Sequence, residues 1–301
     1  MLTLFDRRIG GRTLRELAWE LYRGGAYRPP RSELELAQLV QIQRRISGGV
    51  PVPKMPYVPG NRKVGRIWTF DLPPVLTCPY ATFCGRPGSA GLYRGRGLVC
   101  YDINIARYNP LHLLREYINF IHVVREGYSW LRDWTRFVVD YRGARIIRFH
   151  VGGDVFSDWY WGYLKKLASD FLHVTFYLYT RSFPIVAASP ERPPNLVVLM
   201  SLDGANYKAY EKYGAYFDHI TYLAAGEDAR GQIPAIEALA KWAAQNGKRL
   251  IIFLEHRRLP QLRQALEKYS QYICPNELGV NTTCEKCRRC FAPPRDRHFT
   301  A

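Results

Sequence analysis

Apolar and polar residues follow two different periods along the chain from residue 64 onward. Six short segments have the pattern of strands, and we predict strands at Val64–Asp71, Ala144–Val151, His173–Thr180, Leu196–Leu202, His219–Ala224 and Arg249–Glu255. Between them, apolar residues recur at helical spacing, which predicts helices at Leu111–Glu126, Ser157–Ser169, Asn206–Tyr213 and Ile233–Gln245. Strands that alternate with helices are typical of parallel βαβ units, so the pattern predicts an α/β fold.

Six such units would form a partial or complete (βα)6 barrel, and a doubly wound open sheet fits the same pattern. In both architectures the ligand site lies at the C-terminal ends of the strands. In the second predicted strand, Ile147, Phe149 and Val151 share one face, whereas Arg148 and His150 share the other. Helices on the apolar face and a polar lumen opposite would produce this split, and so would a sheet with one solvated face.

Two further segments flank this core. The residues from Thr13 to Tyr22 and from Glu33 to Ile46 have helical spacing, and a connector rich in Pro and Gly follows from Gly48 to Gly60. We therefore predict three regions: an N-terminal helical accessory segment at 1–60, a βα barrel with a three-cysteine loop at 61–260, and a C-terminal four-cysteine metal-binding tail at 261–301.

The composition is that of a globular protein, with 47% hydrophobic and 23% charged residues. No apolar run approaches the length that crosses a bilayer, so we expect no membrane partner. The N-terminal residues lack the order of charge, apolar stretch and cleavage site of a signal peptide. We therefore expect an intracellular, cytoplasmic protein, in the host cytoplasm if it is viral.

The chain is strongly basic. Its 43 lysine and arginine residues exceed its 26 aspartate and glutamate residues, which gives a formal net charge of +17 and a pI near 9.7. Such a surplus favours phosphate-bearing partners and makes nucleic acid a candidate partner of the basic surface. An arginine-rich surface with networks of ion pairs, as in thermostable proteins, would give the same balance, and charge alone does not separate the two interpretations.

Seven cysteines fall into two groups, three near residue 90 and four near residue 285. Disulfides are rare in a reducing cytosol, and an odd number of cysteines cannot pair completely within one chain. The distribution therefore favours metal binding by both groups of cysteines.

Cys78, Cys84 and Cys100 form the first group, in a loop directly after the first predicted strand. The loop is rich in glycine, which lets a backbone wrap around an inorganic core, and in arginine, which balances thiolate charge. Three thiolates would hold a four-iron, four-sulfur (4Fe-4S) cluster with one iron open to an external ligand, unless Asp102 reaches in and closes the site. The alternative interpretation is three buried and inert cysteines.

Cys274, Cys284, Cys287 and Cys290 form the second group, and the last three are separated by two residues each. Four cysteines with such short spacings are a strong metal-site signature, and the run of three favours an iron–sulfur cluster. Zinc also fits, because four thiolates satisfy its tetrahedral preference. Since all four ligands come from the protein, we predict a closed site for structure or electron transfer.

Polar residues stand at several predicted strand ends. Gly152-Gly153-Asp154 ends the second strand, where paired glycines allow close approach of a ligand and the aspartate can accept from an amine. Ser201 and Asp203 close the fourth strand, and Glu255 ends the sixth. Each residue alone is more often a cap or a turn, but their shared position at strand C-termini favours a ligand site.

Five motifs occur in a fixed order over roughly residues 65 to 291: Thr77-Cys78-Pro79, Cys100-Tyr101, His150-Val151-Gly152-Gly153-Asp154, Tyr179-Thr180-Arg181-Ser182, and Cys274-Pro275 with the triple-cysteine run. In this order they resemble the phage gene-product-eighty-eight family. That family resembles a distant branch of the radical S-adenosylmethionine enzymes, whose cluster loop has spacings of three and two residues where this chain has five and fifteen.

The resemblance implies a six-unit βα barrel in which the first cysteine group holds the open cluster. It also implies that the strand end with Asp in place of the superfamily's Glu binds the methionyl amine of S-adenosylmethionine. The implied cofactor-binding residues are Gly152, Gly153, Asp154 and Ser201. The candidate catalytic residues, each at a strand end, are Arg181, Asp203 and Glu255.

Three functions follow as hypotheses. The leading one is an enzyme that cleaves S-adenosylmethionine reductively at the open cluster, with electrons from a donor protein, and abstracts hydrogen from a substrate in the barrel. The rival is a nucleic-acid-binding protein without turnover, whose iron–sulfur or zinc sites are structural. The third is a metal-assisted hydrolase that uses Asp154, Asp203 and Glu255.

Overall fold

The computed structural model of the chain describes residues 6–82, 100–225, 230–255 and 259–292. A two-stranded ribbon of β1 (Arg8–Ile9) and β2 (Arg12–Thr13) precedes the main sheet. The strands of the main sheet are β3 (Tyr57–Val58), β4 (Trp68–Phe70), β5 (Ile146–Phe149), β6 (Thr175–Thr180), β7 (Leu196–Asp203), β8 (His219–Ala224) and β9 (Leu250–Leu254). The helices are α1 (Leu14–Arg23), α2 (Glu33–Ile46), α3 (Tyr101–Tyr108), α4 (Pro110–Glu126), α5 (Tyr128–Asp140), α6 (Asp158–Asp170), α7 (Phe183–Ala188), α8 (Tyr210–Tyr213), α9 (Ile233–Gln245), α10 (Leu259–Ala265) and α11 (Cys284–Cys287).

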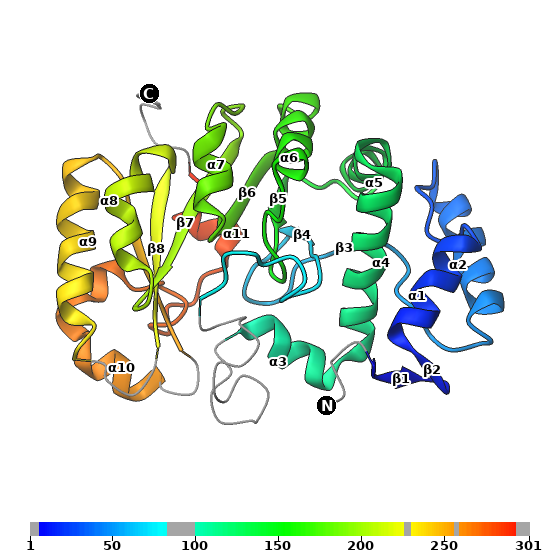
Figure 1. The fold of residues 1–301 in the computed structure, drawn as a ribbon, viewed down its shortest axis with the longest axis horizontal. Coiled ribbons are helices and arrows are strands. Elements are labelled where there is room, and N and C mark those ends of the chain that lie inside the picture. Colours follow the sequence, from blue (N-terminus) through cyan, green and yellow to red (C-terminus); the bar gives the residue numbers. More distant parts are fainter. Residues whose placement is uncertain (1–5, 83–99, 226–229, 256–258, 293–301) are drawn as a thin grey trace.

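The parallel strands of the main sheet follow one another in chain order (Figure 1). β3 pairs antiparallel with β4, and each strand from β4 to β8 pairs parallel with the next. A doubly wound sheet needs a reversal of strand order, so this order excludes that alternative. The predicted α/β class is confirmed, but the described residues form an open sheet with β3 and β9 at its ends, and no closed barrel.

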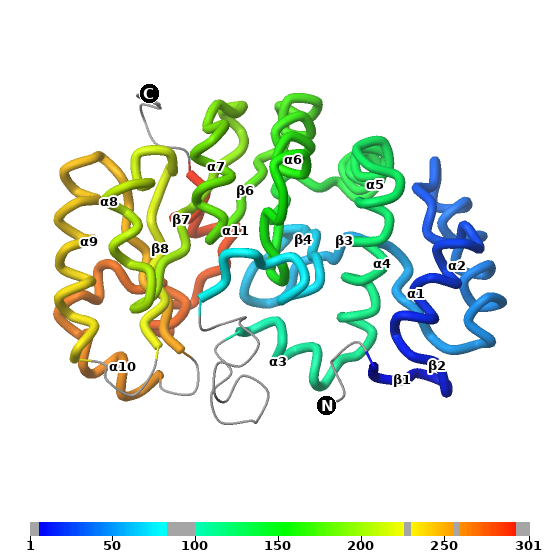
Figure 2. The backbone as a smooth tube through the Cα atoms, viewed as in Figure 1, coloured from blue at the N-terminus to red at the C-terminus, as the bar shows by residue number. Residues whose placement is uncertain are grey.

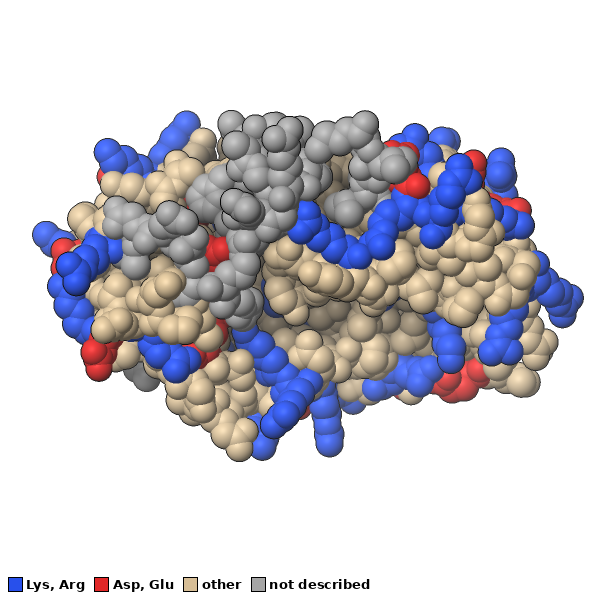
Figure 3. Space-filling view, turned by 90° about the horizontal axis from the view of Figure 1, so that it is seen from below, with Lys and Arg blue, Asp and Glu red and all other residues tan. Residues whose placement is uncertain are grey.

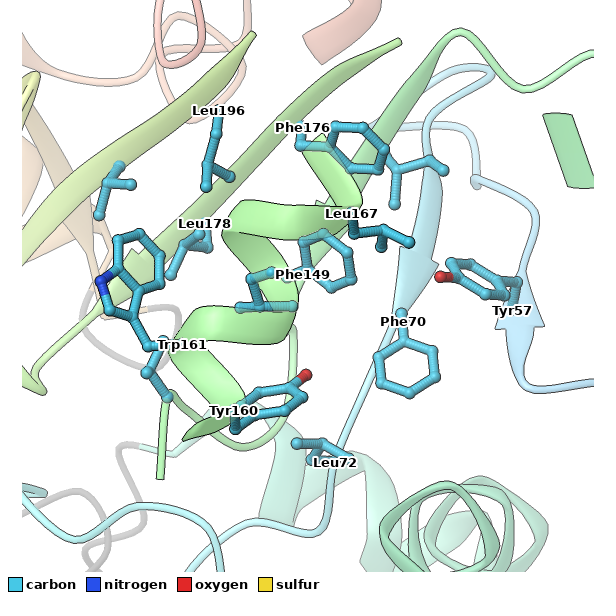
Figure 4. Close-up of a cluster of buried hydrophobic side chains, with 14 of the residues drawn as sticks. Tyr57, Phe70, Leu72, Phe149, Tyr160, Trp161, Leu167, Phe176, Leu178 and Leu196 are labelled. Atoms are coloured by element: carbon cyan, nitrogen blue, oxygen red, sulfur yellow. The ribbon is translucent and has the colours of Figure 1, made fainter. Parts of the chain in front are cut away.

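Helices cover one face of the sheet and bury its main core (Figure 4). Phe149 of β5 and Phe176 of β6 point to this face, with ring centroids 5.7 Å apart. α6 lies across the strands and adds Trp161 and Leu167 to the same buried cluster. Each of these side chains stabilises the fold by about 1.5–3 kcal/mol through burial. Ile147 and Phe149 both lie in this core, as predicted for that face, whereas Val151, the third residue of the predicted face, follows the strand and lines the cavity at its end.

Helix α6, which contributes to this core, has a polar cap at its start and a glycine in its interior. The hydroxyl of Ser157 accepts a hydrogen bond from the amide of Tyr160 at 3.3 Å and so caps the start of α6. Gly162 lies inside the helix, and a Cβ atom built there would meet no atom within 4 Å. Glycine inside a helix is less stable than alanine by about 1 kcal/mol.

We therefore expect Gly162→Ala to raise the free energy of unfolding by about 0.5–1 kcal/mol. Gly143→Ala is the matched control, because Gly143 also has open space around it but has a φ of +66°. Alanine in that left-handed conformation should lower stability by about 1 kcal/mol. Urea unfolding of the three proteins measures both changes, and equal effects at the two positions would contradict the assigned backbone conformations.

The N-terminal segment packs against the core through α1. Thr13 and Glu16 form a capping box at its start, in which each side chain accepts from the other residue's amide. Leu14, Leu17 and Leu21 are fully buried and belong to the same cluster as the apolar residues of α4. Figure 2 shows α1 and α2 together at one end of the molecule, beside α4. Both N-terminal helices were predicted at these positions.

The C-terminal segment lies against the other face of the sheet. Ile273 forms a parallel bridge with Ile252 of β9, and Phe291 stacks on Tyr177 of β6 with ring centroids 4.7 Å apart. Tyr177 and Phe291 belong to a second, smaller buried cluster, whereas Ile252 and Ile273 belong to the main one. In Figure 2 the segment, coloured orange to red, passes behind β6 and β7. This face is therefore covered by the tail, where the sequence suggested either solvent or a polar lumen.

Two predicted elements differ from the structure, several short elements (β1 to β3, α7, α10 and α11) were not predicted, and the other predicted strands and helices agree within two residues at each end. β4 starts four residues late, because Asn61 Oδ1 accepts from the amides of Lys63 and Val64, and Gly65 has a φ of +76°. The predicted helix Asn206–Tyr213 is a 3-10 turn followed by the single turn α8. Helices α3 and α5 were not predicted. None of the helices in the described residues is long and apolar enough to cross a bilayer.

Candidate functional site

A cavity of about 910 Å³ lies at the edge of the sheet where the parallel strands end. Six of the seven cysteines line it: Cys78, Cys100, Cys274, Cys284, Cys287 and Cys290. Figure 3 views the molecule from the side of α3 and α10 and shows a hollow with basic side chains beside it. Cys78 and Cys100 of the first group, more than 170 residues before the tail cysteines in the sequence, thus face the same space as the four tail cysteines.

The first cysteine group begins in a tight turn after β4. The amide of Cys78 donates to the carbonyl of Val75 at 3.4 Å, and Val75 has a left-handed φ of +70°. The hydroxyl of Thr77 donates to the carbonyl of Pro73 at 2.8 Å and fixes the same turn. Cys100 is the residue that directly precedes α3. Cys84 lies outside the described residues, so the complete three-cysteine site stays a prediction.

The four tail cysteines are thiols, and the fold brings them together. α11 spans Cys284–Cys287, and the amide of Cys284 donates to the carbonyl of Lys63 at 3.0 Å. The hydroxyl of Tyr179 donates to the sulfur of Cys290. Burial, with repulsion from the other three thiolates, raises the pKa of Cys290 to about 12. A cation in place of the thiol protons would relieve this repulsion, so the donor set fits a metal centre.

A buried arginine faces the same cysteines. The guanidinium of Arg148 on β5 lies 4.7 Å from the centre of the Tyr179 ring, and its Nε atom has no hydrogen-bond partner. Burial lowers the pKa of Arg148, but attraction to Tyr177, Tyr179, Asp71 and Cys284 outweighs burial and raises it. Arg148 therefore places a permanent positive charge beside the tail thiolates.

The two glycines that follow β5 stand where the chain packs tightly around the cavity. A Cβ atom at Gly152 would lie 2.2 Å from Oδ2 of Asp102, and one at Gly153 would lie 2.5 Å from the Thr77 hydroxyl. The amide of Leu72 donates to the carbonyl of Gly152 at 3.1 Å. Packing alone therefore requires glycine at both positions, and both line the cavity as predicted for a ligand-binding strand end.

Asp154 accepts hydrogen bonds from its own chain on both oxygens. Oδ1 accepts from the hydroxyl of Thr180 at 2.5 Å and from the amide of Val155 at 2.7 Å, while Oδ2 accepts from the amide of Arg181 at 2.9 Å. Burial raises the pKa of Asp154 to about 6. The carboxylate fixes the ends of β5 and β6, and Oδ2 keeps capacity for one further donor.

The other predicted site residues divide into those that line the cavity and one that supports them. Asp203 is fully buried and accepts from the guanidinium of Arg181 and from the hydroxyl of Thr82. It orients Arg181, which lines the cavity together with Ser201 and Glu255. Of the three candidate catalytic residues, Arg181 and Glu255 therefore line the cavity, whereas Asp203 is buried and holds Arg181 in place.

His150, two residues before the paired glycines, has an unusual backbone. His150 has a left-handed φ of +63° and is 3% exposed. Its Nε2 lies 2.9 Å from the hydroxyl of Tyr160. Burial, with the nearby charge of Arg148, lowers the pKa of His150 to about 3, so the ring is neutral. Strained non-glycine residues of this kind concentrate at functional sites.

A buried cluster on α3 and α4 was not predicted. Asp102, His112 and Glu116 each bring one ligand atom to within 4.8 Å of the others. Oδ1 of Asp102 lies 2.6 Å from Nε2 of His112, so this oxygen is engaged within the cluster. The spacing of four residues between His112 and Glu116 was visible in the sequence as one helix face. Their convergence with Asp102 depends on how α3 packs against α4, which the sequence pattern does not show.

A profile of the family described as gene product 88 matches residues 54–293, about four fifths of the chain. The chain belongs to the gene product 88 family. The gene product 88 match spans β3 to β9 and all seven cysteines, whereas α1 and α2 lie outside it. It confirms the family that the sequence motifs resembled. No curated protein and no solved structure matches the chain significantly.

Proposed function

We propose that this gene product 88 protein is an iron–sulfur enzyme that binds S-adenosylmethionine at the strand ends, cleaves it reductively and abstracts hydrogen from a second substrate. The observation that carries the proposal is that Cys78, Cys100, the four tail cysteines and the Gly152-Gly153-Asp154 strand end meet at one cavity of about 910 Å³. A structural metal site is closed by its ligands and needs no adjoining cavity. A cavity of this size suits a nucleoside-sized ligand.

The cysteines divide into an open and a closed set under this proposal. Cys78, Cys84 and Cys100 hold the open 4Fe-4S cluster, and the four tail cysteines hold the closed one. The run of three cysteines separated by two residues each supports an iron–sulfur cluster in the tail, and four thiolates also satisfy zinc. When bound, the open cluster supplies the electron that breaks the sulfonium carbon–sulfur bond.

The chain's own residues would bind and shield the ligand. The paired glycines let it approach the backbone, and Oδ2 of Asp154 accepts from the methionyl amine. The guanidinium of Arg181, held by Asp203, binds the methionyl carboxylate. Tyr179 and Phe253 line the cavity with ring centroids 5.8 Å apart and exclude water from the reacting bond.

The tail would receive electrons from a donor protein. Lys286 and Arg288 are exposed on either side of Cys287 in the tail. Exposed basic residues at this point attract an acidic partner to the closed cluster. We therefore infer that the donor is an acidic electron-transfer protein.

Nucleic-acid binding without turnover is the second candidate function. The net charge of +17 favours it, as do the basic side chains beside the hollow in Figure 3. The metal-assisted hydrolase has less support, because Asp154 and Asp203 already accept several hydrogen bonds from their own chain. Oxygen ligands of a catalytic metal would have to be released from these partners.

The proposed activity is tested with anaerobically reconstituted protein reduced by dithionite. S-adenosylmethionine should change the electron paramagnetic resonance spectrum of the reduced cluster and yield methionine and 5′-deoxyadenosine. Cys100→Ser should abolish both effects, whereas iron bound by the tail should remain. Cys287→Ser is the matched control and should leave the spectral response to S-adenosylmethionine in place. A fully loaded protein that shows neither response, yet binds duplex DNA or RNA with strong salt dependence, would support the second candidate instead.

A further inference from the structure

The cluster on α3 and α4 has the composition and closeness of a metal site that contains no cysteine. His112 Nε2 lies 2.6 Å from Asp102 Oδ1 and 3.0 Å from Glu116 Oε1. His112 and Glu116 project from one face of α4, and Asp102 comes from the first turn of α3. One imidazole nitrogen and two carboxylates thus converge from two helices on one point.

Two carboxylate oxygens in this cluster lack a partner in the protein. Asp102 is 1% exposed and Glu116 is fully buried, yet Oδ2 of Asp102 and Oε2 of Glu116 form no hydrogen bond. A buried carboxylate oxygen without a donor is costly, because it loses its hydration without compensation. Gly152 packs against both groups, since a Cβ there would lie 2.2 Å from Asp102 Oδ2 and 2.7 Å from Glu116 Oε1. Because Gly152 has no side chain, the carboxylates of Asp102 and Glu116 can lie close together beside it.

Charged groups of both signs surround the cluster. Asp71 is a third buried carboxylate nearby, and Arg115 lies 4.0 Å from Asp71 Oδ2 and 2.7 Å from His112 Nδ1. Arg148 on β5 also attracts Asp71. The unpartnered oxygens of Asp102 and Glu116, rather than the net charge, are therefore what a divalent cation would satisfy.

We propose that Asp102, His112 and Glu116 bind one divalent cation, separate from both cysteine groups. One imidazole and two carboxylates suit a first-row transition ion such as Mn²⁺, Fe²⁺ or Zn²⁺. The cation takes the place of the proton on His112 Nε2. The remaining ring proton then resides on Nδ1, and the guanidinium of Arg115 turns from that nitrogen to its other neighbour, Asp71.

A cation at this site would hold α3, the helix that follows Cys100, in place against its neighbours. Asp102 is two residues after Cys100, the residue that directly precedes α3. The other two proposed ligands, His112 and Glu116, belong to the long helix α4. A cation shared between the helices ties α3 to α4 and to the strand end at Gly152. Its function is to position Cys100 at the cavity, and it does not depend on which metal the cysteines hold.

Mn²⁺ is the probe of choice, because it prefers oxygen and nitrogen ligands and binds thiolates weakly. Full-length protein, dialysed against EDTA and oxidised so that iron–sulfur centres are silent, is titrated while the resonance of free Mn²⁺ is recorded. One tight Mn²⁺ site per chain is expected. Glu116→Gln and Asp102→Asn should each weaken it by at least about tenfold.

The same helix offers a matched control. His122 and Glu126 have the same spacing on α4, and their side chains pair at 2.7 Å, but in the described part of the chain no third carboxylate joins them to form a metal-binding group. Glu126→Gln should therefore leave Mn²⁺ affinity unchanged. Circular dichroism shows whether each variant is folded, and metal analysis of undialysed protein detects a cation that EDTA does not remove. The proposal is overturned if wild type neither binds Mn²⁺ tightly nor retains such a cation, or if Glu116→Gln and Glu126→Gln behave alike.

Discussion

Cys290→Ser is expected to remove metal from the tail and to lower the melting temperature by roughly 10 °C, about 5 kcal/mol for a chain of this size. Cys290 lies among the other tail cysteines and accepts a hydrogen bond from Tyr179, which stands on β6. Its metal would join the tail to the centre of the sheet. Because metal binding at a closed site is also folding free energy, a lost ligand reduces both metal content and stability.

The decisive comparison is made with and without metal. Iron and sulfide content and thermal unfolding are measured for wild type and Cys290→Ser, both reconstituted and after chelation. The stability difference should be large in the reconstituted proteins and small in the chelated ones, because serine replaces sulfur with little change in volume. A difference that persists after chelation would assign the effect to packing at Cys290, and the metal centre would lose its main support.

Acidification from pH 7 to pH 4 is expected to remove about 3 kcal/mol of stability through His150. The pKa of His150 is about 3 in the folded protein and near 6.5 in the unfolded chain, because burial disfavours the charged ring. The folded value is depressed, so the contribution is complete above pH 6.5 and is lost as the pH falls toward 3. Asp154 acts in the opposite direction, since its raised pKa of about 6 adds stability over the same range.

His150→Asn separates the two contributions. Asparagine tolerates the left-handed backbone at this position and does not titrate, while Asp154 is unchanged. The difference in unfolding free energy between wild type and variant, measured in urea from pH 7 to pH 4, should shrink by about 3 kcal/mol. A difference that stays constant with pH would show that the ring is not buried as a neutral group.

In the tail, the presence of a candidate metal site could be predicted from the sequence, but its location on the sheet could not. The short spacing of its cysteines was sufficient to predict a metal site, because spacing is a local property. Its location on the sheet depends on contacts far apart in sequence: Ile273 joins β9, and the carboxylate of Glu285 accepts from the amide of Arg66 at 3.0 Å. Such contacts leave no periodic signal, so the meeting of Cys78 and Cys100 with the tail cysteines at one cavity was found only in the structure.

The strand-end acids show a second limit. Asp154 and Asp203 were predicted at the ligand edge, and both lie there because the ends of parallel strands share one edge. Which donors satisfy them could not be predicted, since Thr180, Arg181 and Thr82 reach them only through the relative positions of neighbouring strands. The sequence thus located the acids but did not distinguish a ligand-binding carboxylate from a supporting one.

Strand order has a consequence for how the protein is made. Since each parallel strand pairs with the one synthesised before it, the sheet can grow on the ribosome one βα unit at a time. The face opposite the helices stays uncovered until residues 273–291 emerge and dock. During that interval Cys78 and Cys100 border a space that the tail has not yet reached, because the tail cysteines line the other part of the same cavity. Under the proposed function, a metal could then enter at the first cysteine group before the tail completes the cavity, so that translation itself would order the two events.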